Sequence, residues 1–206
     1  MDEPAGWFGK LPCCGDFVAR RLDVEVVRVL DAWLSRSMRV ARERRGDAWL
    51  RSYLAARVVC FAWRPGVVGE QGWYGVLMPS CDNVGRYFPL VVLQACARPP
   101  EDAEERARLR CWHARHGAAA LHVLDDDVSL EDFERDLQVA ASAEEPAPDT
   151  ARADWWEALD ADPAARTAWW AHDAADAAVV VHAGLPDPEA FMRLLDDDPD
   201  EAVRSA

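Results

Sequence analysis

The chain has 206 residues, half of them apolar, and a formal net charge of −14. This length and apolar content supply a large core, which excludes disorder of the chain as a whole. The acidity disfavours nucleic acids and anionic membrane surfaces as partners, because both are bound through lysine and arginine. We expect a single domain over residues 1–206.

The first predicted element is a short strand over residues 6–11, which Pro12 ends and a turn follows. Apolar residues then recur at spacings of three and four over residues 24–45, and this spacing predicts a long amphipathic helix. Gly46 ends this helix, and Asp47 is the expected N-cap of a second, short helix.

The middle of the chain predicts three strands, over residues 57–63, 73–78 and 87–96. The loops between them leave no room for a helix, so we expect antiparallel neighbours. The third strand is almost continuously apolar, which indicates burial on both of its faces.

Helices are predicted next over residues 101–124 and from Ser129 onward, where Asp132 nearly completes a capping box. Residues 143–153 are acidic and contain two prolines, so we expect a flexible surface loop. Strands over residues 167–172 and 178–183 suggest a hairpin.

The last predicted helix starts with Asp187 as its N-cap and Pro188 in its first turn. Residues 196–206 are expected to form a frayed acidic tail. These elements together predict an α/β protein of the α+β type with three layers. A central mixed, largely antiparallel sheet of five or six strands would carry helices on both faces.

Two tryptophan pairs are candidate interface anchors. If each pair lies in a strand, its two rings point to opposite faces and one of them is exposed. Exposed aromatic rings are favoured anchors in protein interfaces. The pairs are Trp155–Trp156 and Trp169–Trp170.

Two segments, residues 9–18 and 75–90, are denser in glycine, proline and charge than packing alone requires. Each places an aspartate and glycines in a turn beside a strand, where glycine permits unusual backbone angles and aspartate binds backbone amides. The two turns meet if their strands are neighbours. The cluster is then a partner-binding or phosphate-sensing patch, or else a buried ion-pair network that fixes the turns. The candidate residues are Lys10, Gly15, Asp16, Asp82, Gly85 and Arg86.

These two segments resemble the TagF family of type VI secretion-associated proteins. The sequence GKLPCCGDFV at residues 9–18 matches the pattern G-K-L-P-x-x-G-D-F-V, and GVLMPSCDNVGRYFPL at residues 75–90 matches a second family pattern. Tryptophan–leucine pairs, Trp155–Trp156 and the sequence GLPDP near the C-terminus also look familial. The resemblance extends from Gly6 to about Leu195.

The resemblance implies a cytoplasmic, post-translational repressor of type VI secretion. Such proteins act through the forkhead-associated scaffold protein of that system, and they oppose activation by a Ser/Thr kinase whose partner is a phosphatase. The resemblance implies no catalytic residues, no metal and no cofactor, so we expect a binding protein and not an enzyme.

Other functions have weaker support in the sequence. The chain contains neither the glycine-lysine loop of P-loop nucleotide hydrolases nor the G-x-S-x-G nucleophile turn. A phosphate- or nucleotide-sensing domain and a small hydrolase that uses the polar turns stay open as alternatives. No signal peptide and no apolar run of about 20 residues is visible, so the cytoplasm with free thiols is expected. Among the six cysteines, only the adjacent Cys13 and Cys14 lie in a polar turn.

Overall fold

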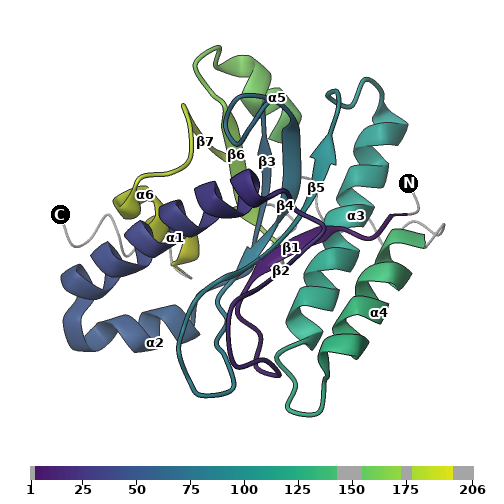
Figure 1. The fold of residues 1–206 in the computed structure, drawn as a ribbon. Coiled ribbons are helices and arrows are strands. Elements are labelled where there is room, and N and C mark those ends of the chain that lie inside the picture. Colours follow the sequence, from purple (N-terminus) through teal and green to yellow (C-terminus); the bar gives the residue numbers. More distant parts are fainter. Residues whose placement is uncertain (1–2, 143–154, 173–177, 197–206) are drawn as a thin grey trace.

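The computed structural model describes residues 3–142, 155–172 and 178–196. Seven strands form one sheet in the order β2-β1-β5-β4-β3-β6-β7, and every pairing between these strands is antiparallel (Figure 1). The strands are β1 (Gly6–Gly9), β2 (Val18–Arg20), β3 (Val59–Trp63), β4 (Gly72–Met78), β5 (Leu90–Cys96), β6 (Thr167–Ala171) and β7 (Val180–His182). The α+β class is confirmed, with β2 as the strand that the sequence did not predict.

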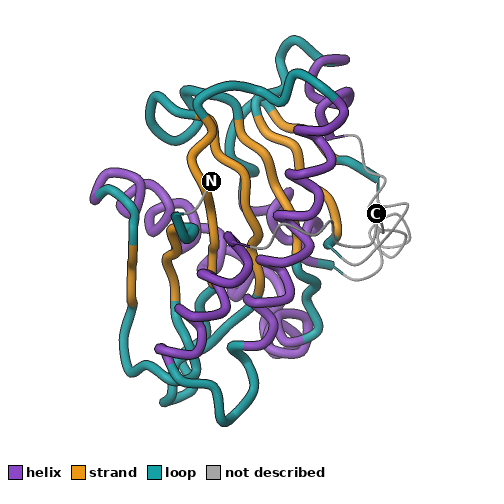
Figure 2. The backbone as a smooth tube through the Cα atoms, turned by 90° about the vertical axis from the view of Figure 1, so that its right-hand side faces the viewer, coloured by secondary structure: helices purple, strands orange, loops and turns teal. Residues whose placement is uncertain are grey.

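Helices cover both faces of the sheet, so the predicted three layers are confirmed (Figures 1 and 2). One layer contains α1 (Val24–Arg45), α2 (Trp49–Leu54) and α6 (Pro188–Leu195), and the opposite layer contains α3 (Ala103–His122), α4 (Leu130–Ser142) and α5 (Trp155–Ala161). None of the helices in the described part of the chain is long and apolar enough to cross a bilayer.

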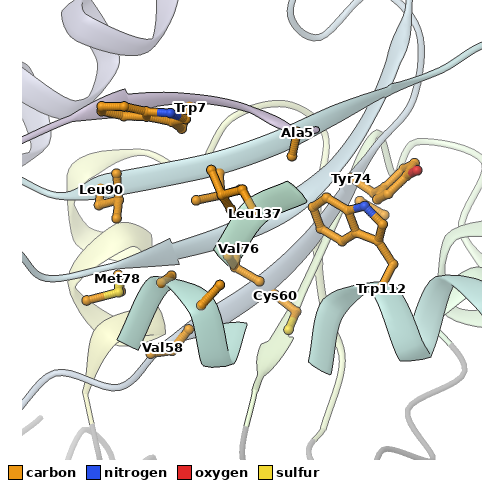
Figure 3. Packing of buried hydrophobic residues seen from close by; sticks show 14 of the residues in the cluster. Ala5, Trp7, Val58, Cys60, Tyr74, Val76, Met78, Leu90, Trp112 and Leu137 are labelled. Carbon is orange, nitrogen blue, oxygen red and sulfur yellow. The ribbon is translucent and has the colours of Figure 1, made fainter. Parts of the chain in front are cut away.

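The sheet separates two hydrophobic cores because side chains alternate along each strand. On β3, Cys60 and Ala62 face α3–α5, whereas Phe61 and Trp63 face α1 and α6. Figure 3 shows the first of these cores, where Trp112 of α3 lies against Tyr74 of β4.

The tryptophan pair of β6 obeys the same alternation. Trp169 and Trp170 point to opposite faces, but only 1% and 5% of their surfaces are exposed. The expected exposed ring in this pair is therefore wrong, because helices cover both faces of the sheet. Trp155 and Trp156 do not form a strand either. They begin α5, where Trp155 is buried and Trp156 is half-buried.

The predicted helix over residues 24–45 is confirmed at both ends. Asp47 is not an N-cap, because the chain passes from Gly46 through a single 3-10 turn (Gly46–Ala48) directly into α2. The turn predicted around residues 173–176 lies outside the described residues, but the antiparallel pairing of β6 with β7 is confirmed. So is the cap of α6, where the Asp187 carboxylate accepts the backbone N–H groups of Glu189 and Ala190.

The predicted loop over residues 143–153 lies outside the described residues, as does the predicted tail over residues 196–206 apart from Asp196. The Asp196 carboxylate forms an ion pair of 2.5 Å with Arg45 of α1, which ties the end of α6 to the end of α1.

Candidate functional site

The two glycine-rich motif segments meet at one end of the sheet. The first forms the turn between β1 and β2, and the second forms the turn between β4 and β5; because β1 pairs with β5, the turns lie side by side (Figure 1). The backbone N–H of Asn83 donates to the carbonyl of Cys14 at 3.0 Å. The Arg86 guanidinium donates to the carbonyl of Gly15. The sequence-based expectation that the turns converge is thus met by direct hydrogen bonds.

Asp82 lies at the centre of this contact. Its Oδ2 atom accepts from Lys10 Nζ at 2.7 Å and from Arg86 Nε at 2.6 Å. Its Oδ1 atom accepts the backbone N–H groups of Val84 at 3.2 Å and Arg86 at 2.8 Å. The side chains of Lys10 and Asp82 are 5% and 0% exposed. Both oxygens of the carboxylate therefore have partners inside the protein.

The pKa of the Asp82 carboxyl reflects this environment. Burial alone would raise it, since burial penalises the charged form. The hydrogen bonds from Lys10, Arg86 and Val84 together outweigh burial, and they hold the pKa of Asp82 well below its ordinary value. The carboxylate is therefore charged at neutral pH and forms an ion pair with Lys10.

A second set of hydrogen bonds ties the turns to α2. Ser80 Oγ donates to the carbonyl of Lys10 at 2.7 Å. The Tyr53 hydroxyl donates to the carbonyl of Ser80 and accepts its backbone N–H, both at 2.9 Å. Sequence reasoning missed Ser80 and Tyr53 as parts of the site. The only signal for Ser80 was its place inside the second motif, and Tyr53 gave none because it looked like an ordinary core residue of a helix.

Two positions of the motifs require glycine, each for a different structural reason. Gly85 has a φ of +78°, a left-handed conformation that glycine tolerates, and its N–H donates to the Asp82 carbonyl at 3.0 Å. Gly9 has a φ of +148°, and a Cβ atom there would lie 2.2 Å from the carbonyl oxygen of Pro89. The close approach of β1 to the start of β5 thus requires glycine.

Several side chains of the paired turns face solvent, and we call three of them the motif surface: Phe17, Val84 and Arg86. They are 43%, 69% and 57% exposed, the last value referring to the Arg86 side chain. Phe17 is held by Phe88, with ring centroids 4.8 Å apart, and its ring lies 4.7 Å from Lys10 Nζ. The motif surface therefore stands on a buried, fixed base.

Three predicted site residues do not join the group around Asp82. Asp16 is exposed, and its carboxylate accepts the N–H of the adjacent Phe17 at 2.8 Å instead of joining Asp82 and Lys10. Trp155 and Trp156 lie on α5, which Figure 1 places at the opposite end of the sheet. There Trp155 stacks on Trp170, with centroids 5.8 Å apart, and the Arg64 guanidinium lies 5.6 Å from the ring of Trp156.

Cys13 of the first turn is not a reactive thiolate. Cys13 Sγ lies 3.8 Å from Cys14 Sγ, and both are free thiols. Burial, followed by the contact with Cys14, raises the pKa of Cys13 to about 11, so the thiol is protonated at neutral pH. Within the described ranges, no three His, Cys, Asp or Glu side chains gather into a metal-binding group.

Comparisons with known proteins agree with these motifs. The family model of the TagF N-terminal domain, described as type VI secretion system-associated, matches residues 6–140. The crystal structure of PA0076 from Pseudomonas aeruginosa PAO1 is similar to the chain, with 31% sequence identity over 94% of each chain and a TM-score of 0.73. Curated protein sequences give no significant match. The matched family segment includes both turns of the motif surface and all residues that bind Asp82, and this chain belongs to the TagF family of type VI secretion system-associated proteins.

Proposed function

We propose that this protein is a post-translational negative regulator of type VI secretion that acts by binding the forkhead-associated scaffold protein of the system. Membership of the TagF family carries this proposal. In the same proposal the protein acts in the cytoplasm. There it opposes activation through the Ser/Thr kinase that is paired with a phosphatase.

The geometry of the motif turns supports binding more than catalysis. A general acid or base needs a free position for a substrate proton, but both oxygens of Asp82 already accept hydrogen bonds. Lys10 is buried against Asp82, so its charge is neutralised before any phosphate could approach. These contacts disfavour a hydrolase and a phosphate sensor at this place, and they leave a stable surface that a protein partner can contact.

The motif surface is the contact that we propose for the scaffold. It combines two exposed apolar side chains, Phe17 and Val84, with the half-exposed guanidinium of Arg86. Aromatic and arginine side chains on a rigid base are favoured anchors in protein interfaces, because little conformational entropy is lost when they bind.

The test is co-purification of the full chain with the folded scaffold protein, followed by titration of the complex. We expect a complex at micromolar concentrations, and Val84→Glu should weaken it at least tenfold because the substitution places a charge on the contact. Val84 is the most suitable position, since its side chain is exposed and takes no part in the hydrogen bonds to Asp82.

Arg36→Glu is the matched control, because Arg36 is exposed on α1, away from the turns. It should leave affinity and repression of secretion in cells unchanged. Absence of a complex between the two folded proteins would refute the binding mechanism. Equal weakening by both variants would refute the motif surface as the contact.

A further inference from the structure

The sheet has an open edge beside β5. The last pair between β1 and β5 joins Gly6 to Leu93, whereas β5 continues to Cys96 and stays paired with β4 as far as Gly72. Residues 94–96 therefore have no strand on their β1 side within the part of the chain that the structure describes. Alternate residues along a strand direct their N–H and C=O groups toward each side, so this edge presents backbone donors and acceptors.

The segment before β1 does not close this edge. Pro4 has no backbone N–H to donate, and the carbonyl of Ala5 accepts from Arg21 Nε at 2.9 Å. Figure 1 shows the chain before β1 turning away from β5 and passing across α3. The path of the chain before β1 thus leaves residues 94–96 of β5 without a neighbouring strand on this side.

Two hollows flank the open edge, one on each face of the sheet. On the face of α1, a hollow of 400 Å³ is lined by Ala95 together with Glu3, Asp23 and Trp73. On the face of α3, a hollow of 360 Å³ is lined by Cys96 together with Tyr74, Pro99 and Leu109. An added strand would direct successive side chains into the two hollows in turn.

The chemistry of the two hollows differs. In the first, Asp23 occupies the N-cap position of α1 but its carboxylate makes no capping hydrogen bond, and Glu3 is exposed beside it. Arg21 also lines this hollow, but its guanidinium forms an ion pair with Glu134 at 2.8 Å. The first hollow therefore suits a lysine or arginine side chain. The second is mainly apolar through Tyr74, Pro99 and Leu109, so it suits an aliphatic or aromatic side chain. Its lining also contains Arg108 and the ion pair of Arg98 with Glu105.

We propose that residues 94–96 of β5 accept an extended segment of a partner protein as an added antiparallel strand in line with β1. Basic side chains of that segment enter the hollow beside Asp23, and the alternate apolar side chains enter the hollow beside Tyr74. Main-chain hydrogen bonds supply affinity in this mode of recognition, and the pockets for alternate side chains supply specificity. This inference rests on the proposed function in one respect, that the protein binds a protein partner. The contact that we infer at residues 94–96 lies away from the motif surface.

The test uses the full chain and a displayed library of random ten-residue peptides. We expect selection to enrich peptides in which basic and apolar residues alternate. Hydrogen exchange should show protection of amides within residues 94–96 when such a peptide is bound. Ala95→Trp, which fills the first hollow, should weaken the enriched peptides at least tenfold, as measured by fluorescence anisotropy.

Val180→Trp is the matched control, because Val180 is 43% exposed on β7, the strand at the outer edge of the sheet. It should change peptide affinity less than twofold. A second variant, Glu3→Gln with Asp23→Asn, leaves the strand intact and should remove the preference for basic residues. If Ala95→Trp lowers the melting temperature, this double variant takes its place as the test of the first hollow.

The proposal is overturned if no peptide is enriched. It is equally overturned if enriched peptides bind Ala95→Trp and the double variant as they bind the original chain. The scaffold protein takes no part in this experiment. Failure of the scaffold to co-purify therefore counts against the proposed function alone, and failure of peptide binding counts against the open edge of β5 alone.

Discussion

At the scale of single residues, the charged side chains of the paired turns lie in two environments, one buried and one half-exposed. Asp82 and Lys10 are buried and satisfy each other, whereas Arg86 reaches the same carboxylate from a half-exposed position. Removal of one member of a buried ion pair leaves an uncompensated charge in the interior, and this costs far more than the loss of an exposed pair. The three residues look equivalent in the sequence, yet their environments give them different expected mutant effects.

Asp82→Asn should lower the melting temperature by roughly 10 °C, because Lys10 would remain buried without its counter-charge. Asp16→Asn is the control, since Asp16 is exposed and binds only the adjacent N–H, and it should shift the melting temperature by no more than about 2 °C. Differential scanning calorimetry on both variants checks this. Equal melting temperatures for Asp82→Asn and the original chain would contradict the anchoring role of the pair.

At the scale of elements, the structure shows where sequence patterns suffice. The 22 residues of α1 carry a long apolar stripe, and so the helix could be predicted with its ends. β2 has three residues and α5 has seven, which is too short for periodicity to show. The tryptophan pair at the start of α5 suggested a strand because aromatic residues favour strands, but packing against Trp170 decided otherwise.

The candidate site was also predictable from the sequence only in part. The meeting of Lys10, Asp82 and Arg86 could be predicted, since turns beside neighbouring strands lie close together. The absence of Asp16 from this group could not, because a local hydrogen bond to the next backbone N–H competes with the distant lysine. The buried ion pair of Lys10 and Asp82 is one of the two alternatives that the sequence left open, and the structure confirms it for these two residues. The sequence could not decide between the alternatives, since burial of Lys10 depends on contacts that form only in the complete sheet.

Gly75 gives a test of the packing between β4 and β5. A Cβ atom at Gly75 would lie 2.3 Å from the carbonyl oxygen of Val92 and 2.5 Å from the ring of Phe61. Gly75→Ala should therefore destabilise the protein by about 1–3 kcal/mol or more, because neighbouring backbone must shift. Gly184→Ala, where no atom lies within 4 Å, is the control and should change the free energy of unfolding by less than about 1 kcal/mol. Urea denaturation of both variants measures the difference, and a Gly75→Ala variant as stable as the original would contradict it.

At the scale of the whole molecule, two buried histidines make stability depend on pH. Burial lowers the pKa of His113 to about 4, although the carbonyls of Leu109 and Phe61, one beside each ring nitrogen, oppose this shift by favouring the protonated ring. Burial also lowers the pKa of His116 to about 4, and its Nε2 atom has no hydrogen-bond partner among the described residues. Both rings are therefore neutral in the folded protein at pH 7, and the unfolded chain binds protons more readily as the pH falls.

Stability should fall as the pH decreases from about 6.5 to about 4, by an amount of the order of 3 kcal/mol for each histidine. The exposed His122 acts in the opposite direction, since its hydrogen bond with Asp136 raises its pKa and stabilises the protein only while the ring is protonated. Urea unfolding at intervals between pH 7 and pH 4.5 measures the slope, in a range where carboxylates of lowered pKa contribute little. His116→Phe, which keeps the stack on Trp112, should reduce the slope by about half. A free energy of unfolding that is constant over this range would contradict the prediction.

The order of strands also has a consequence for synthesis of the protein. β6 lies between β3 and β7, so Val59 pairs with Ala171, far beyond the segment that ends at residue 140. All five residues of β3 are buried in the finished fold. A nascent chain that has not yet reached β6 therefore exposes one apolar edge of β3, which is a template for association with other chains. A chain that stops near residue 140 lacks β6 and leaves this edge of β3 unpaired, so it should be prone to aggregate.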